Sequence, residues 1–268
     1  MINLPCSVKI TFNASHPICR SPLAFAELRA SDRLPVRKSS WEMGTKWAET
    51  VKKAEQLVER TMKGNDASHD ASHVWRVRSL ALSLASEEEA LSSNSDSLQI
   101  VELAALLHDI GDYKYLRDPS EEKIVEKFLE EEGIEEVKKV KILSIIRGMG
   151  FKEELAGHGN SENCPEFGVV QDADRLDAIG AIGIARCFTF GGSRSRVLHD
   201  PTIHPRSDLS KEQYMKKEEQ TTINHFHEKL LKLKDLMKTE AGKRRAEKRH
   251  KFMEEYLNQF YEEWDGRA

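Results

Sequence analysis

The stretch from Val101 to Tyr115, VELAALLHDIGDYKY, constrains the fold more strongly than the other motifs of the chain. Its apolar residues leave almost no polar face, so it predicts a buried helix. His108 and Asp109 come at the end of this helix, and Gly111 lets the backbone turn away just beyond them. A buried imidazole beside a carboxylate is costly, and a metal ion removes that cost because both groups are good ligands. The alternative is an exposed His and Asp near a helix end.

Two further stretches place histidine or aspartate beside apolar runs. SHDASHVWRV spans Ser68 to Val77, and VVQDADRLDA spans Val169 to Ala178. A helix is predicted over roughly residues 71–89, with Ser68 as its N-cap. His73 lies on the apolar face of that helix, which is formed by Val77, Leu80, Ala81 and Leu84. Its imidazole is therefore expected to point inward, either as a metal ligand or as a buried, hydrogen-bonded side chain.

The order of these motifs, His, then His-Asp, then Asp, resembles that of the HD-domain metal-dependent phosphohydrolases. The closer resemblance is to their YpgQ/YedJ-like branch, through the motifs SHDxxHxxRV, LAALLHDIxDxK and VQDADRLDAIGAIGIARxF. It extends from about Trp47 to Trp264 and includes several long motifs in the same order. It implies an all-α fold, an HD-domain helical bundle with additional C-terminal helices. The body of the chain contains no alternating apolar pattern typical of a strand, which agrees with this fold class.

The resemblance also implies a single divalent metal ion, with the ligands His73, His108, Asp109 and Asp174. Two imidazoles and two carboxylates suit Mn, Co, Ni, Fe or Zn better than Mg, and we expect Mn. Asp172 and Asp174 diverge by about 200° of rotation on a regular helix, so they cannot both reach one ion. Asp174 is the expected ligand because the fourth ligand of HD proteins commonly follows an alanine and precedes x-Leu.

Two residues after the HD pair are candidates for catalysis. Related HD nucleotidases place an acidic residue at the position of Asp112 as general acid or base, so we predict that role here. Lys114 follows on the same loop, where its charge can stabilise a phosphate in the transition state. A surface aspartate at a helix end is the alternative interpretation of Asp112.

Three side chains are predicted to contact the substrate, namely His69, Arg76 and Asp177. Each has an alternative role. His69 is the alternative to His73 as first ligand, and Arg76 can simply pair with an acid. Asp177 shares a helical face with Asp174, so it can instead orient a metal ligand.

Composition limits the partners of the chain. The net charge is -4 over 268 residues, so there is no overall basic field that would favour nucleic acid. No apolar run approaches the roughly 20 residues of a membrane span. The cysteines form no CxxC pair and are expected to be free thiols in a reducing compartment; they are Cys6, Cys19, Cys164 and Cys187. We therefore expect neither nucleic acid nor membrane as partner. The resemblance to HD-domain phosphohydrolases implies a small-molecule phosphate substrate, a nucleotide.

The chain is predicted to consist of a disordered extension, residues 1–40, and an HD phosphohydrolase domain with a C-terminal helical extension, residues 41–268. The extension is rich in Ser, Pro and basic residues, which is typical of a transit peptide. If it is one, the protein belongs in a chloroplast or mitochondrion, and otherwise in the cytoplasm. Residues 211–264 predict a long helical region whose apolar stripe fits core packing or a homodimer contact.

The resemblance implies hydrolysis of nucleoside triphosphates to monophosphate and pyrophosphate by a metal-activated water. The first alternative is a 5′-nucleotidase that releases orthophosphate from the same metal site. The second is a non-catalytic nucleotide-binding sensor, which would be expected to have lost metal ligands. All four ligand positions are present, so the sequence favours an enzyme.

Overall fold

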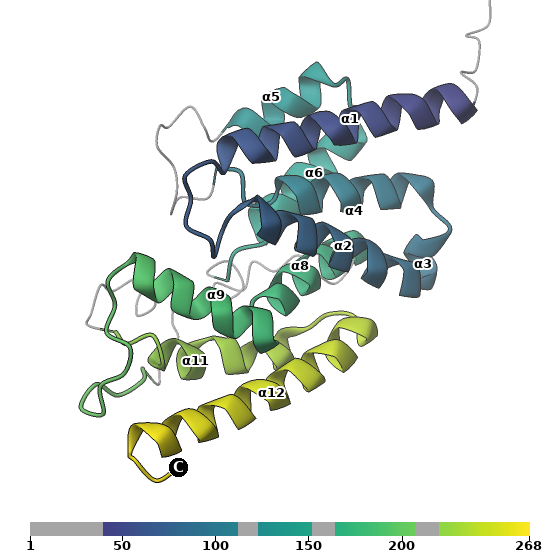
Figure 1. The fold of residues 1–268 in the computed structure, drawn as a ribbon. Coiled ribbons are helices and arrows are strands. Elements are labelled where there is room, and N and C mark those ends of the chain that lie inside the picture. The colour runs from purple at the N-terminus through teal and green to yellow at the C-terminus, as the bar shows by residue number, and fades with distance from the viewer. Residues whose placement is uncertain (1–39, 112–122, 152–163, 207–219) are drawn as a thin grey trace, which may run out of the picture. The chain divides into compact units, whose positions relative to one another are not determined.

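The computed structural model describes residues 40–111, 123–151, 164–206 and 220–268, with side chains from residue 44 onward. By its internal contacts the chain separates into residues 1–43 and residues 44–268, and only the second unit is described below. The described ranges contain helices and no strands (Figure 1), which confirms the predicted all-α fold. The proposed transit peptide lies outside the described residues.

Helix α4 (Ser95–Leu107) is buried along most of its length, as its apolar sequence predicts. It begins at Ser95 because the Asn94 side chain accepts hydrogen bonds from the backbone N–H groups of Asp96 and Ser97. Its buried residues are Ser97, Ile100, Val101, Leu103, Ala104, Ala105, Leu106 and Leu107.

The end of α4 differs from the prediction that the helix includes the HD pair. The helix ends at Leu107, and His108 and Asp109 lie in the turn that follows. His108 Nδ1 approaches the carbonyl of Ala105 at 2.9 Å, an acceptor that the next backbone N–H would use in a continuing helix. Gly111 completes the turn with a φ of 83°, a left-handed conformation that glycine adopts without strain. His108 and Asp109 therefore lie directly after the C-terminal end of a buried helix.

Helices α2 (Ala71–Glu87) and α8 (Pro165–Asp177) pack against each other and against α4, and Figure 1 shows the three together at the centre of the fold. The N-cap of α2 is Asp70, whose carboxylate accepts from the backbone N–H of His73, so the prediction of Ser68 as N-cap is wrong. Because α2 packs against α8, the first turn of α2 and the last turn of α8 bring His73 and Asp174 close together.

The buried stretch that begins at α8 continues into a second helix. After α8 the chain turns, and α9 (Gly180–Ser193) begins at a glycine with a φ of 75°. Gly191 and Gly192 both belong to α9 and do not end it. The sequence AIGAIGIA is apolar and helix-compatible throughout, so only the left-handed glycine marks the turn.

The remaining helices before α8 form an outer layer around α4. The indole N–H of Trp47 donates to Glu102 at 2.9 Å and links the first helix to α4, while the last of these helices packs on α4 and α8. They are α1 (Ser40–Thr61), α3 (Glu89–Ser92), α5 (Ile124–Glu131) and α6 (Glu136–Gly148).

The C-terminal region contains several helices rather than one. They are α11 (Asn224–Glu228), the 3-10 helix η2 (Leu230–Leu236) and α12 (Glu240–Trp264). The predicted apolar stripe supplies buried residues from each of them, such as Phe226, Leu233 and Met253. Most of this stripe is core, and α12 packs against α8 and α9.

Asp172 explains why α12 begins where it does. Its fully buried carboxylate accepts hydrogen bonds from the backbone N–H of Lys238 at 2.9 Å and from that of Thr239 at 2.7 Å. Thr239 is the N-cap of α12, and its hydroxyl accepts from the N–H of Gly242. Asp172 therefore fixes the start of α12 and does not face the other aspartates and histidines.

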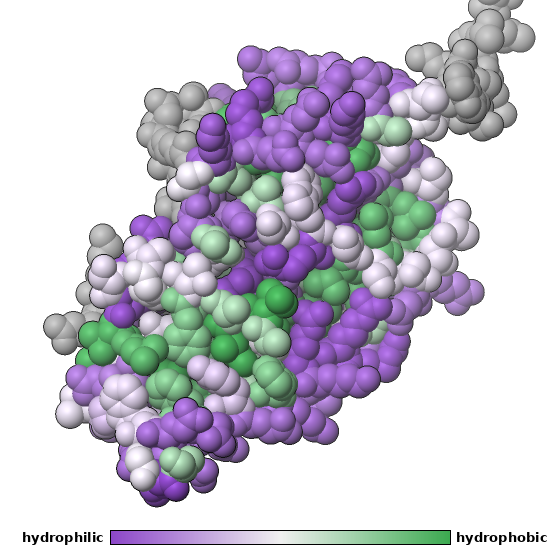
Figure 2. Space-filling view, in the orientation of Figure 1, coloured by the Kyte–Doolittle hydropathy of each residue, from purple (hydrophilic) through white to green (hydrophobic). Residues whose placement is uncertain are grey.

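Part of the surface over α9, α11 and α12 is apolar (Figure 2). Ile182 on α9 and Phe252 on α12 are 45% and 48% exposed. This surface is compatible with the predicted homodimer, which stays a prediction. Among the described residues, none of the helices combines the length and apolar character needed to span a membrane.

Candidate metal centre

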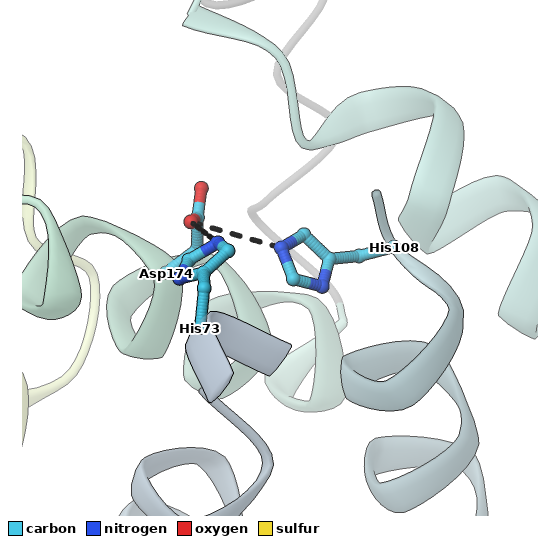
Figure 3. Close-up of side chains that lie close together, drawn as sticks. All are labelled: His73, His108 and Asp174. Atoms are coloured by element: carbon cyan, nitrogen blue, oxygen red, sulfur yellow. Dashed lines mark ion pairs between the residues drawn. The ribbon is translucent and has the colours of Figure 1, made fainter. Parts of the chain in front are cut away.

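Three helices bring His73, His108 and Asp174 together (Figure 3). His73 comes from the first turn of α2, His108 from the turn after α4, and Asp174 from the last turn of α8. One nitrogen or oxygen atom of each lies within 4.8 Å of the others, so this group could hold a metal ion. Residues separated by 35 and 66 positions in the chain therefore converge on one point, as expected of a binding site.

Asp109, the fourth predicted ligand, lies beside the same group. One of its carboxylate oxygens is 3.3 Å from His73 Nε2 and the other is 3.4 Å from His108 Nε2. Both imidazoles are 1% exposed, whereas Asp109 is 18% and Asp174 32% exposed. The carboxylates thus form the more open side of the centre, from which a substrate can approach.

The far nitrogen of each imidazole is occupied by a protein acceptor. His73 Nδ1 lies 2.7 Å from Asp177 Oδ2, and His108 Nδ1 lies 2.9 Å from the carbonyl of Ala105. Both acceptors require a proton on Nδ1, which leaves the lone pair of a neutral ring on Nε2. The two Nε2 atoms therefore face the centre in the form that binds metals.

The pKa directions of His73, Asp109 and Asp174 indicate that this cluster favours a positive charge. Burial alone lowers the pKa of His73, but its carboxylate partners outweigh burial and raise that pKa to about 10. Burial likewise favours protonation of Asp109 and Asp174, but the two imidazoles hold both carboxyl pKa values well below their usual range. A proton on an imidazole balances the carboxylates, and a divalent cation can take its place.

A metal ion would also provide a partner for an atom that has none among the described residues. His108 Nε2 is buried and has no hydrogen-bond partner among the residues that the structure describes. Such an atom normally costs free energy, because it has lost its hydrogen bonds to water. An ion among the three residues would accept its lone pair, so the donor set fits a transition metal.

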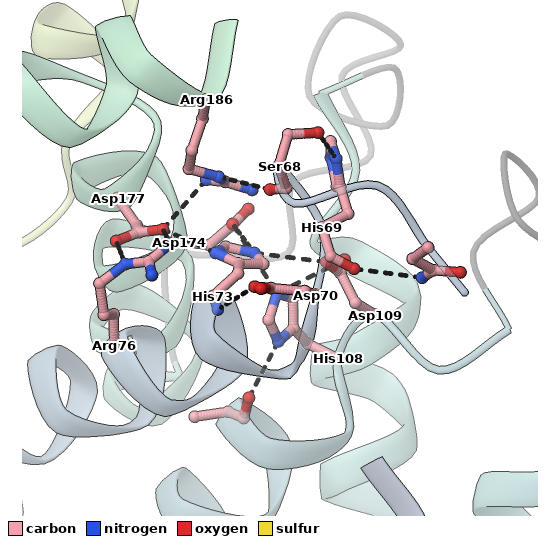
Figure 4. A network of polar contacts seen from close by, with 12 residues as sticks. Ser68, His69, Asp70, His73, Arg76, His108, Asp109, Asp174, Asp177 and Arg186 are labelled. Atoms are coloured by element: carbon pink, nitrogen blue, oxygen red, sulfur yellow. Dashed lines mark hydrogen bonds and ion pairs between the residues drawn. The ribbon is translucent and has the colours of Figure 1, made fainter. Parts of the chain in front are cut away.

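Asp177 joins the metal centre to two arginines (Figure 4). Arg76 contacts it through two hydrogen bonds of 2.7 and 3.0 Å, and Arg186 approaches it at 3.1 Å. Burial raises the carboxyl pKa, but the hydrogen bonds from His73 and Arg76 prevail and lower it to about 2. Asp177 is therefore a charged acceptor behind His73, and the predicted substrate contacts of Arg76 and Asp177 stay predictions.

Arg186 belongs to this network, although its position was not predicted from the sequence. Its Nε donates to the carbonyl of Ser68 at 2.7 Å, and its side chain is only 12% exposed. The signal was a single arginine within the apolar stretch AIGIARCF, since a buried guanidinium needs an acidic partner. Arg186 holds α9 against the start of α2.

His69 lies beside the centre. Its Nδ1 is 2.7 Å from the hydroxyl of Ser68, which in turn donates to the carboxylate of Asp66. Its ring packs against that of His73, with centroids 6.1 Å apart. His69 is thus a neighbour of the centre.

Asp112 and Lys114, the predicted catalytic residues, lie outside the described residues.

The family model for the HD domain matches residues 70–179, which include the histidines and aspartates of the centre. YpgQ of Bacillus subtilis is 35% identical over 228 residues, which cover 81% of this chain and 96% of YpgQ. The chain therefore belongs to the HD-domain family, in the group that includes YpgQ.

Solved structures agree with this assignment. An HD-superfamily hydrolase from Bacillus thuringiensis has a TM-score of 0.60 and 39% identity, and the match covers 82% of this chain and 98% of that one. The crystal structure of Bacillus subtilis YpgQ in complex with ADP has a TM-score of 0.60 and 30% identity, over 81% and 96% of the two chains. The fold is that of an HD-superfamily hydrolase.

Proposed function

We propose that the protein hydrolyses nucleoside triphosphates to a nucleoside monophosphate and pyrophosphate, with Mn as its metal. The observation that carries this proposal is the convergence of His73, His108, Asp109 and Asp174 with both imidazole Nε2 atoms directed inward. The ADP complex of YpgQ supports a nucleotide as substrate, because that relative shares the fold over most of its length.

The side chains around the centre have separate tasks in this proposal. Asp177 and the carbonyl of Ala105 fix the orientation of the two imidazoles, so that ligand geometry is set before metal or substrate binds. When bound, a divalent ion supplies a Lewis acid that polarises a phosphate group and makes water a better nucleophile. Asp112 and Lys114, as predicted from the sequence, would transfer a proton and stabilise phosphate charge.

The reaction balances with water as the only co-substrate. A water oxygen forms a bond to the α-phosphorus, and the bond from that phosphorus to the oxygen bridging it to the β-phosphate breaks. Pyrophosphate leaves with the bridging oxygen, and the proton released by water passes to a base, for which Asp112 is the candidate. The more exposed carboxylate side of the centre, formed by Asp109 and Asp174, is where the phosphate would approach.

Two alternatives predicted from the sequence differ from this proposal, one in the product released and the other in having no reaction. A 5′-nucleotidase would use the same ligands and release orthophosphate from a monophosphate. A nucleotide-binding sensor would bind without turnover. The complete set of four inward-facing ligand groups favours a hydrolase over a sensor, because a binding protein has no need for an activated water.

The test uses the full chain, stripped of metal and then reloaded with Mn, Mg, Co, Ni or Zn one at a time. Each form is incubated with nucleoside mono- and triphosphates, and orthophosphate is separated from pyrophosphate. The control is the double variant His108→Ala, Asp109→Ala. Metal-dependent pyrophosphate release that the variant lacks is the expected result. Orthophosphate without pyrophosphate would select the nucleotidase, and nucleotide binding without any release would select the sensor.

A further inference from the structure

One face of α9 leads away from the metal centre. Arg186, Phe190 and Arg194 follow each other at intervals of four residues, so they lie along one face of the helix. The first of them is part of the centre, because Arg186 contacts both Asp177 and the carbonyl of Ser68. The next two therefore lie one and two helical turns beyond the centre.

Phe190 is linked to the metal centre through His69. Its ring centroid is 5.6 Å from that of His69, whose ring packs in turn against His73. Two guanidinium groups lie over the Phe190 ring, Arg194 at 5.3 Å from its centroid and Arg196 at 5.2 Å. Two permanent positive charges are therefore gathered on one aromatic ring beside the metal centre.

The backbone at the end of α9 is shaped so that both arginines reach this ring. The N–H of Arg196 donates to the carbonyl of Gly191 at 2.9 Å, and that of Ser195 donates to Gly192 at 3.1 Å. These bonds form a Schellman motif, in which the residue after the C-cap takes a left-handed conformation. That residue is Ser195, with a φ of 53°, and it is the one non-glycine with positive φ among the described residues.

Contacts on either side hold this turn in place. Ser193 Oγ lies 3.3 Å from Asp66 Oδ2, in the loop that precedes α2. The carbonyl of Val197 accepts from the backbone N–H of Thr222 at 2.9 Å. The turn is thus fixed both to the loop next to the metal centre and to the start of the C-terminal region, so its charges are positioned before a ligand arrives.

We propose that Arg194 and Arg196 form a clamp for the phosphate groups of the substrate that are not attacked. Phosphate recognition uses the N–H groups in the plane of a guanidinium, whereas stacking on Phe190 uses its face, so the two are compatible. The negative end of the α9 dipole accounts for a favourable cation at this position. The dipole does not account for two arginines on one ring beside the histidines of the metal centre.

This inference rests on the proposed function and narrows it. A triphosphate bound with its α-phosphate at the metal extends two further phosphates, and the clamp offers them two cations. A nucleoside monophosphate has no phosphate to place there. The clamp therefore makes the site selective for polyphosphate chains, and it would stabilise the departing pyrophosphate.

The experiment measures binding of inorganic pyrophosphate, and separately of orthophosphate, by calorimetry to the full chain loaded with Mn and freed of excess metal. The test variant is Arg194→Gln, Arg196→Gln. The matched control is Arg244→Gln, which removes an exposed arginine that pairs with Glu87 at the opposite end of α2 from His73. Bound Mn and the melting temperature are measured for each protein.

The expected result is a loss of pyrophosphate affinity of at least about tenfold in the double variant, since each arginine contributes charged hydrogen bonds. Orthophosphate affinity and Mn content are expected to stay within about twofold of wild type. An unchanged pyrophosphate affinity would overturn the clamp, and so would an equal loss for orthophosphate, because the arginines would then act on the metal-bound phosphate.

Hydrolysis assays keep the two proposals separate. If wild type releases pyrophosphate from a triphosphate and the double variant does so with unchanged KM, the clamp is refuted and the proposed function stands. If wild type binds pyrophosphate through the arginines but hydrolyses no nucleotide, the proposed function fails, and Arg194 and Arg196 form a pyrophosphate-binding site without a role in hydrolysis.

Discussion

Asp177 Oδ2 lies 2.7 Å from His73 Nδ1, while Nε2 of the same ring faces Asp109 and Asp174. One imidazole thus connects a carboxylate held by arginines to the metal centre. A carboxylate behind a ligating histidine fixes its tautomer and makes its free nitrogen a better donor. From this contact we predict that Asp177 positions His73.

The first prediction is that Asp177→Asn weakens metal binding by about 10- to 100-fold, the usual effect of losing such a partner. The substitution removes the charge that keeps His73 oriented and that pairs with Arg76 and Arg186. Titration of the stripped protein with Mn measures the effect. Asp235→Asn, at an exposed position, is the control. Equal Mn affinity in both variants would refute the positioning role.

A second prediction concerns metal removal. Because the ligands are assembled only in the folded chain, Mn should stabilise the protein by about 2.7 kcal/mol at a concentration 100 times its Kd. The melting temperature should rise on adding Mn and fall on adding a chelator. His108→Ala should abolish this response, whereas His204→Ala, which changes an exposed histidine, should retain it. A response that survives His108→Ala would place the metal elsewhere.

The resemblance to HD-domain proteins supplied the residues of the centre, and helical periodicity supplied the inward direction of His73 and the separation of Asp172 from Asp174. His73 occupies the apolar face of α2, and the geometry of a helix separates Asp172 from Asp174. The structure indeed directs Asp172 to the start of α12, and Asp174 to the two histidines. A residue's direction on one helix is a local property, so the pattern of neighbouring residues encodes it.

The connections between helices were predicted less well, because they depend on distant contacts. The chain turns between α8 and α9 at Gly180, within a sequence that is helix-compatible on both sides. The start of α12 depends on a carboxylate 67 positions earlier in the chain, which accepts from Thr239. The position of Arg186 follows from the same turn. Such partners are invisible in any short window of sequence.

A third prediction concerns acid stability and Glu166. Its carboxylate, 2% exposed, lies 2.7 Å from Ser97 Oγ and 2.7 Å from Lys141 Nζ. Burial raises the carboxyl pKa, but these partners outweigh it, so the folded pKa lies below the ordinary value. The stabilisation is therefore complete above the unfolded pKa of about 4.3 and is lost as the pH falls through the lower folded pKa.

Glu166→Gln tests this sign, since it keeps the size and an acceptor but cannot ionise. Urea unfolding between about pH 6 and about pH 3 should show the free energy of unfolding of wild type falling more steeply below about pH 4.3 than that of the variant. Other acidic groups titrate equally in both proteins, so the difference between the curves isolates Glu166. Parallel curves would contradict the prediction.

The fourth prediction compares two glycines. A β-carbon at Gly242 would lie 2.8 Å from Thr239 Oγ1 and would collide with the carboxylate of Asp172, so it would disrupt the hydrogen bonds that start α12. Gly242→Ala should lower the free energy of unfolding by about 1–3 kcal/mol. Gly192, by contrast, lies in α9 with no side-chain or backbone atom near its missing β-carbon.

Gly192→Ala should therefore raise the free energy of unfolding by about 0.5–1 kcal/mol, because alanine loses less backbone entropy than glycine in a helix. Urea unfolding of both variants measures these opposite signs with one chemical change. If both substitutions stabilised the protein, α12 would not depend on the close approach of Asp172 and Gly242. If both destabilised it, the end of α9 would be more tightly packed than its open surroundings indicate.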